Sequence, residues 1–207
     1  LSTGTVTGLI EHFTRFAVLE KIDVPKTIAG FSDVTIEDLP WAVKEINHLA
    51  ARGIIQGVGG DQFAPISDIT RAEFTALMVK ALELDCSVEY DGAFGDVAGD
   101  AWHHGYIQAA VKAGLVKGTS DETFGPNEVI TREQLAVMMA RIIPTDKDAS
   151  GAGFKDAPEI ASWAVDSVNR VVFLGLFNGF PDDSFRPKEP VSRAQAAVVI
   201  YRYLAGS

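Results

Sequence analysis

Apolar residues recur along this chain at the spacing of a helix, and the same order of apolar and polar positions appears three times. Trp41, Trp102 and Trp163 follow one another at intervals of 61 residues. Behind each tryptophan an apolar face of helical period continues until a glycine ends it. The pattern therefore predicts a first helix in each repeat, closed by a glycine in the left-handed conformation. These glycines are Gly53, Gly114 and Gly175.

A second helix is predicted later in each repeat. It begins at an N-capping threonine or serine, and a glutamate or glutamine three residues later completes a capping box. The caps are Thr70, Thr131 and Ser192. An apolar stripe behind each cap indicates packing in the core. The segment between the two helices is rich in glycine, proline and aspartate, which predicts a tight loop.

The repeats divide the chain into four segments, and the predicted fold class is all-α. Residues 1–30 lack the repeat but place apolar side chains on one helical face, which predicts an additional N-terminal helix or linker. The helix-loop-helix repeats are expected at 31–90, 91–150 and 151–207. Because the chain stops just past the last predicted helix, we expect a C-terminal module.

Composition narrows the classes of partner. The 207 residues carry 28 acidic and 18 basic side chains, a net charge of −10, which argues against non-specific binding to nucleic acids or anionic lipids. No apolar run is long enough to predict membrane insertion. The single cysteine, Cys86, fits no disulfide or metal motif, so we expect a small buried side chain.

An arginine directly follows each N-cap, at Arg71, Arg132 and Arg193. A cation in the first turn opposes the positive end of the helix dipole, so stability alone would favour an acidic residue there. With free amides of the helix N-terminus, each guanidinium predicts a site for a carboxylate or phosphate. A structural ion pair with an acidic residue is the alternative. The acidic candidates are Asp33, Asp96 and Asp156.

The three tryptophans are open to two interpretations. An aromatic ring at the start of an amphipathic helix usually packs into the core, but an indole also stacks on sugars and donates to a hydroxyl. Gly57, Gly118 and Gly179 permit either a turn or the close approach of a ligand to the backbone. Arginine, helix amides, tryptophan and glycine together favour an acidic carbohydrate as ligand.

Nothing in the sequence indicates catalysis, a cofactor or a metal. The histidines do not recur between repeats, and no activated nucleophile or phosphate loop is present. Asp182 and Asp183 suggest part of a calcium loop, but Arg186 and Pro187 interrupt the alternation of oxygen ligands. We therefore expect no enzyme and no metal site.

The repeat closely resembles the S-layer homology family over residues 31–205. The residues that carry the resemblance are a Phe-x-Asp-Val/Ala opening, the tryptophan, a Gly-Leu/Ile-x-x-Gly stretch, a Gly-x-x-Asp-x-x-Phe-x-Pro loop and a Thr/Ser-Arg-x-Glu/Gln helix start. The resemblance implies that three such motifs form one pseudo-threefold module with ligand grooves between them. It further implies a non-catalytic, extracellular anchor of an S-layer protein or surface enzyme in the cell wall.

The resemblance also implies a ligand and its contacts. Family members bind a secondary cell wall polymer, typically one bearing pyruvylated N-acetylmannosamine. By position, the arginines would bind the pyruvate carboxylate, the tryptophans and the aspartates Asp33, Asp96 and Asp156 would line the sugar, and the glycines would admit it to the backbone. Two alternatives remain open: a peptidoglycan-binding anchor and a self-association module of a surface layer, with lateral contacts between chains.

The copies differ from one another. Gly60 stands in the first repeat where Asp121 and Asp182 stand in the others, and His103-His104-Gly105 interrupts a helix that elsewhere continues with Ala-Val. We therefore expect the three grooves to differ in affinity, with at least one weak or silent.

Overall fold

The computed structural model describes residues 30–87, 94–143, 151 and 153–206, and its regular secondary structure in these ranges consists of helices. The predicted N-terminal helix lies outside them. The helices are α1 Val43–Ala51, α2 Arg71–Ala81, α3 His104–Lys112, α4 Arg132–Ala140, α5 Val165–Phe173 and α6 Arg193–Gly206, with a short 3₁₀ helix at Ala157–Glu159. The described ranges contain isolated bridges and no strand. The prediction of an all-α fold with three helix-loop-helix repeats is confirmed.

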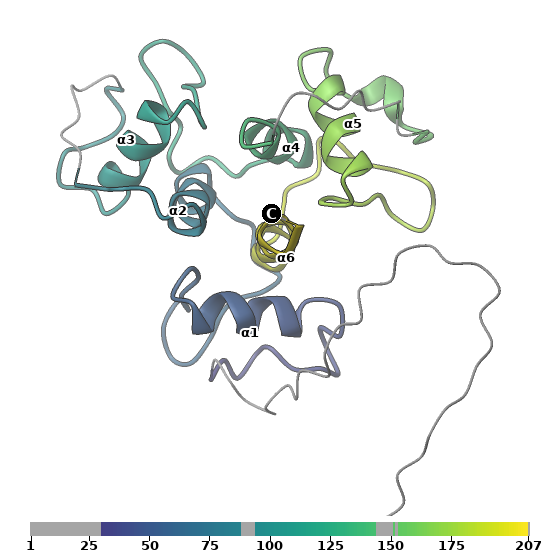
Figure 1. Ribbon diagram of the computed structural model, residues 1–207, viewed down its shortest axis with the longest axis horizontal. Coiled ribbons are helices and arrows are strands. Elements are labelled where there is room, and N and C mark those ends of the chain that lie inside the picture. Colours follow the sequence, from purple (N-terminus) through teal and green to yellow (C-terminus); the bar gives the residue numbers. More distant parts are fainter. Residues whose placement is uncertain (1–29, 88–93, 144–150, 152, 207) are drawn as a thin grey trace, which may run out of the picture.

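The helices pair between repeats rather than within them. α3 packs on α2, α5 packs on α4, and α1 returns to pack on α6, so three lobes surround a common centre (Figure 1). Each lobe therefore combines the second helix of one repeat with the first helix of the next, and the last repeat closes on the first. The three repeats form a single pseudo-threefold body.

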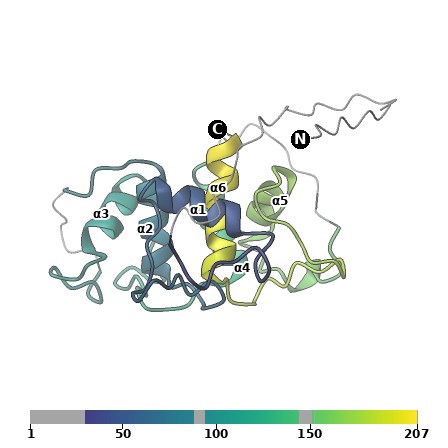
Figure 2. The same cartoon turned by 90° about the horizontal axis from the view of Figure 1, so that it is seen from below.

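Three backbone hydrogen bonds tie the inner helices together just before their N-caps. Ile69 donates to the carbonyl of Val191 at 2.9 Å, Val191 donates to Ile130 at 3.0 Å, and Ile130 donates to Ile69 at 3.1 Å. These bonds form a closed ring around the pseudo-threefold axis. The loops that lead into α2 and α6 gather at the same end of the molecule, the lower edge of Figure 2.

The helix ends follow the predicted local chemistry. Thr70 and Thr131 form complete capping boxes with Glu73 and Gln134, and Ser192 exchanges the same two bonds with Gln195. The glycines after α1, α3 and α5 have positive φ of 70°, 72° and 67°. Behind them the amides of Ile54, Leu115 and Leu176 donate back into the last turn at 2.9–3.0 Å. Both kinds of terminus are confirmed.

The inner helices are buried on more sides than a single apolar stripe suggests. On α2 almost every side chain is buried except Glu73, Leu77 and Lys80. These three lie at helical positions i, i+4 and i+7 and share one face. The inner helices α2, α4 and α6 surround the centre of the module, and on α2 the partly exposed side chains are confined to this one face. No helix in the described part of the chain is long and apolar enough to cross a membrane.

His103 is a buried polar residue at a position where the other repeats carry alanine. Ala42 and Ala164 are fully buried there, and His103 is only 7% exposed. Its Nδ1 atom is buried without a hydrogen-bond partner, and its ring lies 5.2 Å from that of Trp102. Burial, followed by the nearby His104, lowers the pKa of His103 below its usual 6.5. The folded state thus disfavours the protonated imidazole.

We expect His103→Ala to flatten the pH dependence of stability. The pKa of His103 is lower in the folded state than in the unfolded chain, where it is near 6.5. The free energy of unfolding is therefore unaffected by His103 above pH 6.5 and decreases as the pH falls from 6.5 toward the folded pKa. Thermal unfolding of the unmodified chain should therefore shift to lower temperature between pH 7 and pH 5 by more than that of the variant. Parallel curves would contradict a role for His103.

Candidate functional site

Three grooves, one on each inner helix, bring the predicted residues together. Groove 1 lies on α2, groove 2 on α4 and groove 3 on α6, with cavity volumes of about 250, 400 and 130 Å³. An arginine and a tryptophan line each of them. The pairs are Arg193 with Trp102, Arg71 with Trp163, and Arg132 with Trp41.

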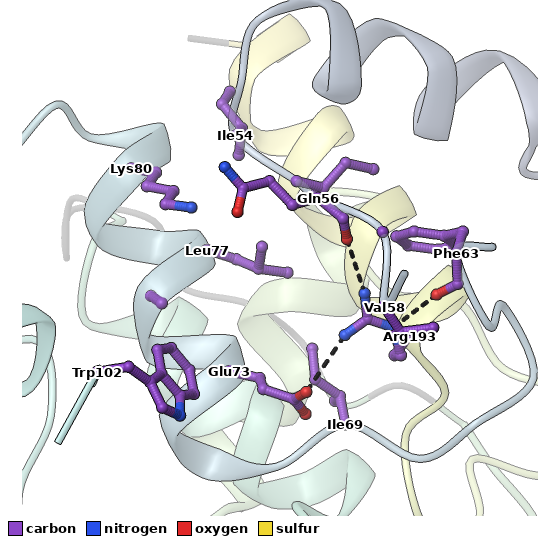
Figure 3. A pocket seen from close by; sticks show the side chains of 13 residues that line it. Ile54, Gln56, Val58, Phe63, Ile69, Glu73, Leu77, Lys80, Trp102 and Arg193 are labelled. Carbon is purple, nitrogen blue, oxygen red and sulfur yellow. Dashed lines mark hydrogen bonds and ion pairs between the residues drawn. The ribbon is translucent and has the colours of Figure 1, made fainter. Parts of the chain in front are cut away.

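Every groove uses all three repeats. In groove 1 the helix and the loop around Gly57 belong to the first repeat, Trp102 to the second and Arg193 to the third. Figure 3 shows Arg193 and Trp102 on opposite sides of this groove, with Leu77 between Glu73 and Lys80. Groove 2 takes its helix and loop from the second repeat, Trp163 from the third and Arg71 from the first. Groove 3 takes its helix and loop from the third repeat, Trp41 from the first and Arg132 from the second. A groove is therefore complete only when the repeats are assembled.

The arginines are held by backbone carbonyls. Arg132 donates from Nε to Phe185 at 2.6 Å and from Nη2 to Asn178 at 2.9 Å, and its guanidinium lies 4.0 Å from the ring centre of Phe177. Arg71 makes the same two bonds to Phe124 and Lys117, and Arg193 to Phe63 and Gln56. Each guanidinium thereby links its helix start to the loop of the following repeat.

Neither sequence-based account of these arginines is complete. The amides of the first two residues of each inner helix donate to loop carbonyls: Arg71 to Glu128, and Ala72 to Pro126. The prediction of free helix amides is therefore wrong, because the neighbouring loop already occupies them. The arginines also form no ion pair with Asp33, Asp96 or Asp156 among the described residues.

One nitrogen of the guanidinium distinguishes the grooves. Nη1 of Arg193 lies 3.3 Å from the carboxylate of Glu73, so this charge is paired inside groove 1 (Figure 3). In grooves 2 and 3 the corresponding helix positions are Gln134 and Gln195. Within the described ranges no residue accepts from Nη1 of Arg71 or Arg132. Burial lowers the pKa of Arg132 to about 10, so the group stays charged at neutral pH.

The tryptophans are exposed. Trp41, Trp102 and Trp163 are 50%, 60% and 58% exposed, and each lies two residues before the first residue of a helix. In the first and third repeats the residue after the tryptophan is an alanine, Ala42 or Ala164, and this alanine is fully buried. The interpretation of the rings as core residues is therefore wrong, and each indole presents an open face at the side of a groove.

The aspartates hold loops instead of lining the grooves. Asp156 accepts from the amides of Phe185 and Arg186 at 2.8 and 2.7 Å. Asp33 and Asp96 bind the corresponding amides of their own repeats at 2.7–2.8 Å. The carbonyl of the same phenylalanine receives the arginine Nε, so the aspartate positions the arginine's acceptor. None of the three aspartates lines a groove described above.

The glycines line the grooves for a packing reason. A Cβ atom on Gly118 would lie 2.5 Å from the Phe94 ring and 2.5 Å from the carbonyl oxygen of Thr123. Gly57 and Gly179 face Phe31 and Phe154 in the same way, and none of the three has a positive φ. The space that a side chain would need is therefore occupied by the opening phenylalanine of each repeat.

A second cation in each groove was missed by sequence reasoning. Lys80, Arg141 and Arg202 line grooves 1, 2 and 3, close to the C-terminal ends of the inner helices. They recur at the same interval of 61 residues as the tryptophans. That register was the available signal. It is less apparent than the tryptophan register because the residue is lysine in the first repeat and arginine in the other two, and because it lies within an apolar stripe.

The described residues show no other chemical centre. They contain no group of three histidine, cysteine, aspartate or glutamate side chains arranged for a metal. Asp182 is engaged with Lys155 at 2.8 Å and with Ser184. Cys86 is partly buried, and burial raises the pKa of its thiol.

Comparison with known proteins gives the family. A model of the S-layer homology domain matches residues 30–75, 93–136 and 153–197, one match for each repeat. The chain belongs to the S-layer homology family. The S-layer homology module is thus an anchoring module of the cell surface, in which three motifs share one core.

Similar modules occur in proteins of different kinds. Over the whole length of this chain, the S-layer homology module is 33% identical to part of an amylopullulanase of Thermoanaerobacterium thermosulfurigenes. It is 35% identical to exoglucanase XynX of Acetivibrio thermocellus over 84% of the chain, and 33% identical to S-layer protein sap of Bacillus anthracis over 96%. The matches span only 11%, 16% and 24% of those proteins. The shared part is therefore common to enzymes and surface-layer proteins.

Proposed function

We propose that this module anchors its protein to the cell wall by binding a secondary cell wall polymer in the grooves, through pyruvylated N-acetylmannosamine. The observation that carries the proposal is that an exposed tryptophan and an arginine line every groove, and in groove 1 they lie on opposite sides (Figure 3). An indole face suits the apolar face of a sugar, and a guanidinium suits a carboxylate. The module itself performs no reaction.

The grooves differ in the charge they offer to such a ligand. In groove 1 the carboxylate of Glu73 neutralises Arg193, so an anionic sugar must compete with it. Groove 2 combines Arg71, Lys117 and Arg141 in the largest of the three cavities. We therefore propose that groove 2 binds most tightly and groove 1 most weakly.

Replacing the tryptophans tests both parts of the proposal. We expect Trp163→Ala to weaken binding to intact cell-wall sacculi about 30-fold, as truncation of a binding hot spot by about 2 kcal/mol would do, and Trp102→Ala to have the smallest effect. Because the rings are exposed, thermal unfolding should stay close to that of the unmodified chain. Co-sedimentation with sacculi measures the binding.

Sacculi stripped of secondary polymer by acid serve as the control substrate. Binding to intact but not stripped sacculi supports the proposal. Equal binding to both would identify peptidoglycan as the ligand. Concentration-dependent oligomers without any binding to sacculi would instead assign the exposed indoles to self-association.

A further inference from the structure

The wall of each groove has a similar order along its helix, a polar side chain followed by an apolar one and then a cation, although the polar group is a carboxylate in groove 1 and an amide in grooves 2 and 3. On α4 it runs from the amide of Gln134, over the apolar side chain of Val137, to the cation Arg141. On α2 the order is Glu73, Leu77, Lys80, and on α6 it is Gln195, Val198, Arg202. Figure 3 shows the sequence for groove 1, with Leu77 between Glu73 and Lys80.

The two cations of a groove lie at opposite ends of this wall. The first cation sits beside the first turn of the helix, as the 3.3 Å contact between Arg193 and Glu73 shows in groove 1. The second cation follows seven residues later, which is about 10 Å along an α-helix. A carboxylate at the first turn is therefore about two helical turns away from the backbone of the second cation. The apolar residue and the tryptophan lie between or beside them and offer no charge.

The second cation has no structural contact that all three repeats share. Arg141 and Arg202 each donate one bond, at 3.2 and 3.4 Å, to the carbonyls of Leu115 and Leu176. Lys80 lies 5.5 Å from the ring centre of Tyr106 instead. What the three positions share is a positive charge that faces a groove. Arg141 is exposed and retains further N–H donors beyond its single carbonyl contact.

We infer that each groove is a two-point site, in which the second cation binds a further acidic group of the same glycan. This inference rests on the proposed function and adds to it that the ligand is an acidic polysaccharide segment with two anionic groups about 10 Å apart. A monosaccharide reaches only the arginine at the helix start. Groove 2 carries the effect most strongly, because neither Arg71 nor Arg141 forms an ion pair among the described residues and because Lys117 adds a third cation to the largest of the three grooves.

Arg141→Met in a chain restricted to groove 2 tests the inference. Trp41→Ala and Trp102→Ala weaken grooves 3 and 1 without disturbing the core, because both rings are exposed. Calorimetric titration then compares two probes: the methyl glycoside of pyruvylated N-acetylmannosamine, and a purified wall-polymer fragment with at least two acidic groups. We expect Arg141→Met to weaken binding of the fragment about tenfold, as the loss of a bond to a charged group predicts, and binding of the monosaccharide less than twofold.

The matched control is Arg170→Met on α5. Arg170 also donates one bond to a carbonyl, that of Ala140 at 3.5 Å, but it lines none of the three grooves. It should leave both titrations unchanged. Arg141→Lys keeps the charge and should retain most of the affinity for the fragment.

Two results would overturn the inference. Either Arg141→Met weakens both probes equally, or it weakens neither while the chain remains folded by circular dichroism. If Arg141→Met unfolds, the comparison passes to Arg141→Lys measured at rising salt, where binding of the fragment must weaken more than binding of the monosaccharide. Failure of the unmodified chain to bind either probe would instead overturn the proposed function itself.

Discussion

Replacing Arg132 by alanine should lower the free energy of unfolding by about 3–5 kcal/mol. The side chain is 2% exposed and is the largest among those fully buried. Its removal leaves the carbonyls of Phe185 and Asn178 without their donors and opens a space beside Phe177. The loop of the third repeat would then be held to α4 mainly by the backbone bonds from Arg132 and Glu133 to Glu189 and Pro187. Urea denaturation followed by circular dichroism measures the change.

Arg186 provides the control for this substitution. Its guanidinium lies 3.9 Å from the ring centre of Phe180, which Arg132 also contacts, but its side chain is partly exposed and its ion pairs lie at the surface. Arg186→Ala should therefore cost less than about 1 kcal/mol. Equal losses for the two variants would mean that stacking on Phe180, and not the two carbonyl bonds, explains the stability.

The second large effect is expected at Asp156, whose replacement by alanine should cost about 2–3 kcal/mol. The carboxylate accepts from two consecutive amides, and Arg186, which supplies one of them, has a φ of 58°. Without the carboxylate this left-handed backbone loses the hydrogen bond that holds the Arg186 amide. Because the adjacent Phe185 carbonyl receives Arg132, loosening the loop also weakens that bond.

The pH dependence identifies the Asp156 contribution. Burial alone would raise the pKa of Asp156, but the two backbone hydrogen bonds outweigh it, so the pKa lies below the ordinary 3.8. Its stabilisation is therefore complete above about pH 4 and is lost as the pH falls through the lower folded pKa. Unfolding measured from pH 6 to pH 2 should show this loss in the unmodified chain and in an Asp100→Ala control. Asp156→Ala should lack that component, and a curve parallel to the control would contradict the assignment.

Local chemistry explains which parts of the fold were predictable. The capping boxes of Thr70 and Thr131 and the positive φ of Gly53, Gly114 and Gly175 depend on residues three or four positions apart, so a sequence pattern contains them. The pairing of α1 with α6 does not depend on such local residues. Each repeat presents the same apolar helix faces, so the pattern cannot say which repeat a given helix packs against. The interleaving of the repeats was therefore visible only in three dimensions.

The site was predictable in its members but not in its assembly. The arginines, tryptophans and glycines do line the grooves, yet each groove takes its arginine and tryptophan from different repeats. Residue type alone does not decide whether a tryptophan is exposed, because its burial depends on which neighbouring residue enters the core. In the first and third repeats the residue that enters the core is the small Ala42 or Ala164. The aspartates could not be assigned from sequence, since their partners are backbone amides about 30 residues away.

The contact between α1 and α6 has a consequence for the order of folding. The first repeat places its leading helix on α6, which is synthesised only after the second repeat and most of the third. Contacts so distant in sequence form late, because the intervening chain must first lose its freedom. Groove 1 lacks its arginine until Arg193 is synthesised, and groove 3 lacks the α6 side chains that line it together with Trp41. A growing chain that ends before α6 therefore has two of its three grooves unfinished, and the proposed binding through all three grooves requires α6.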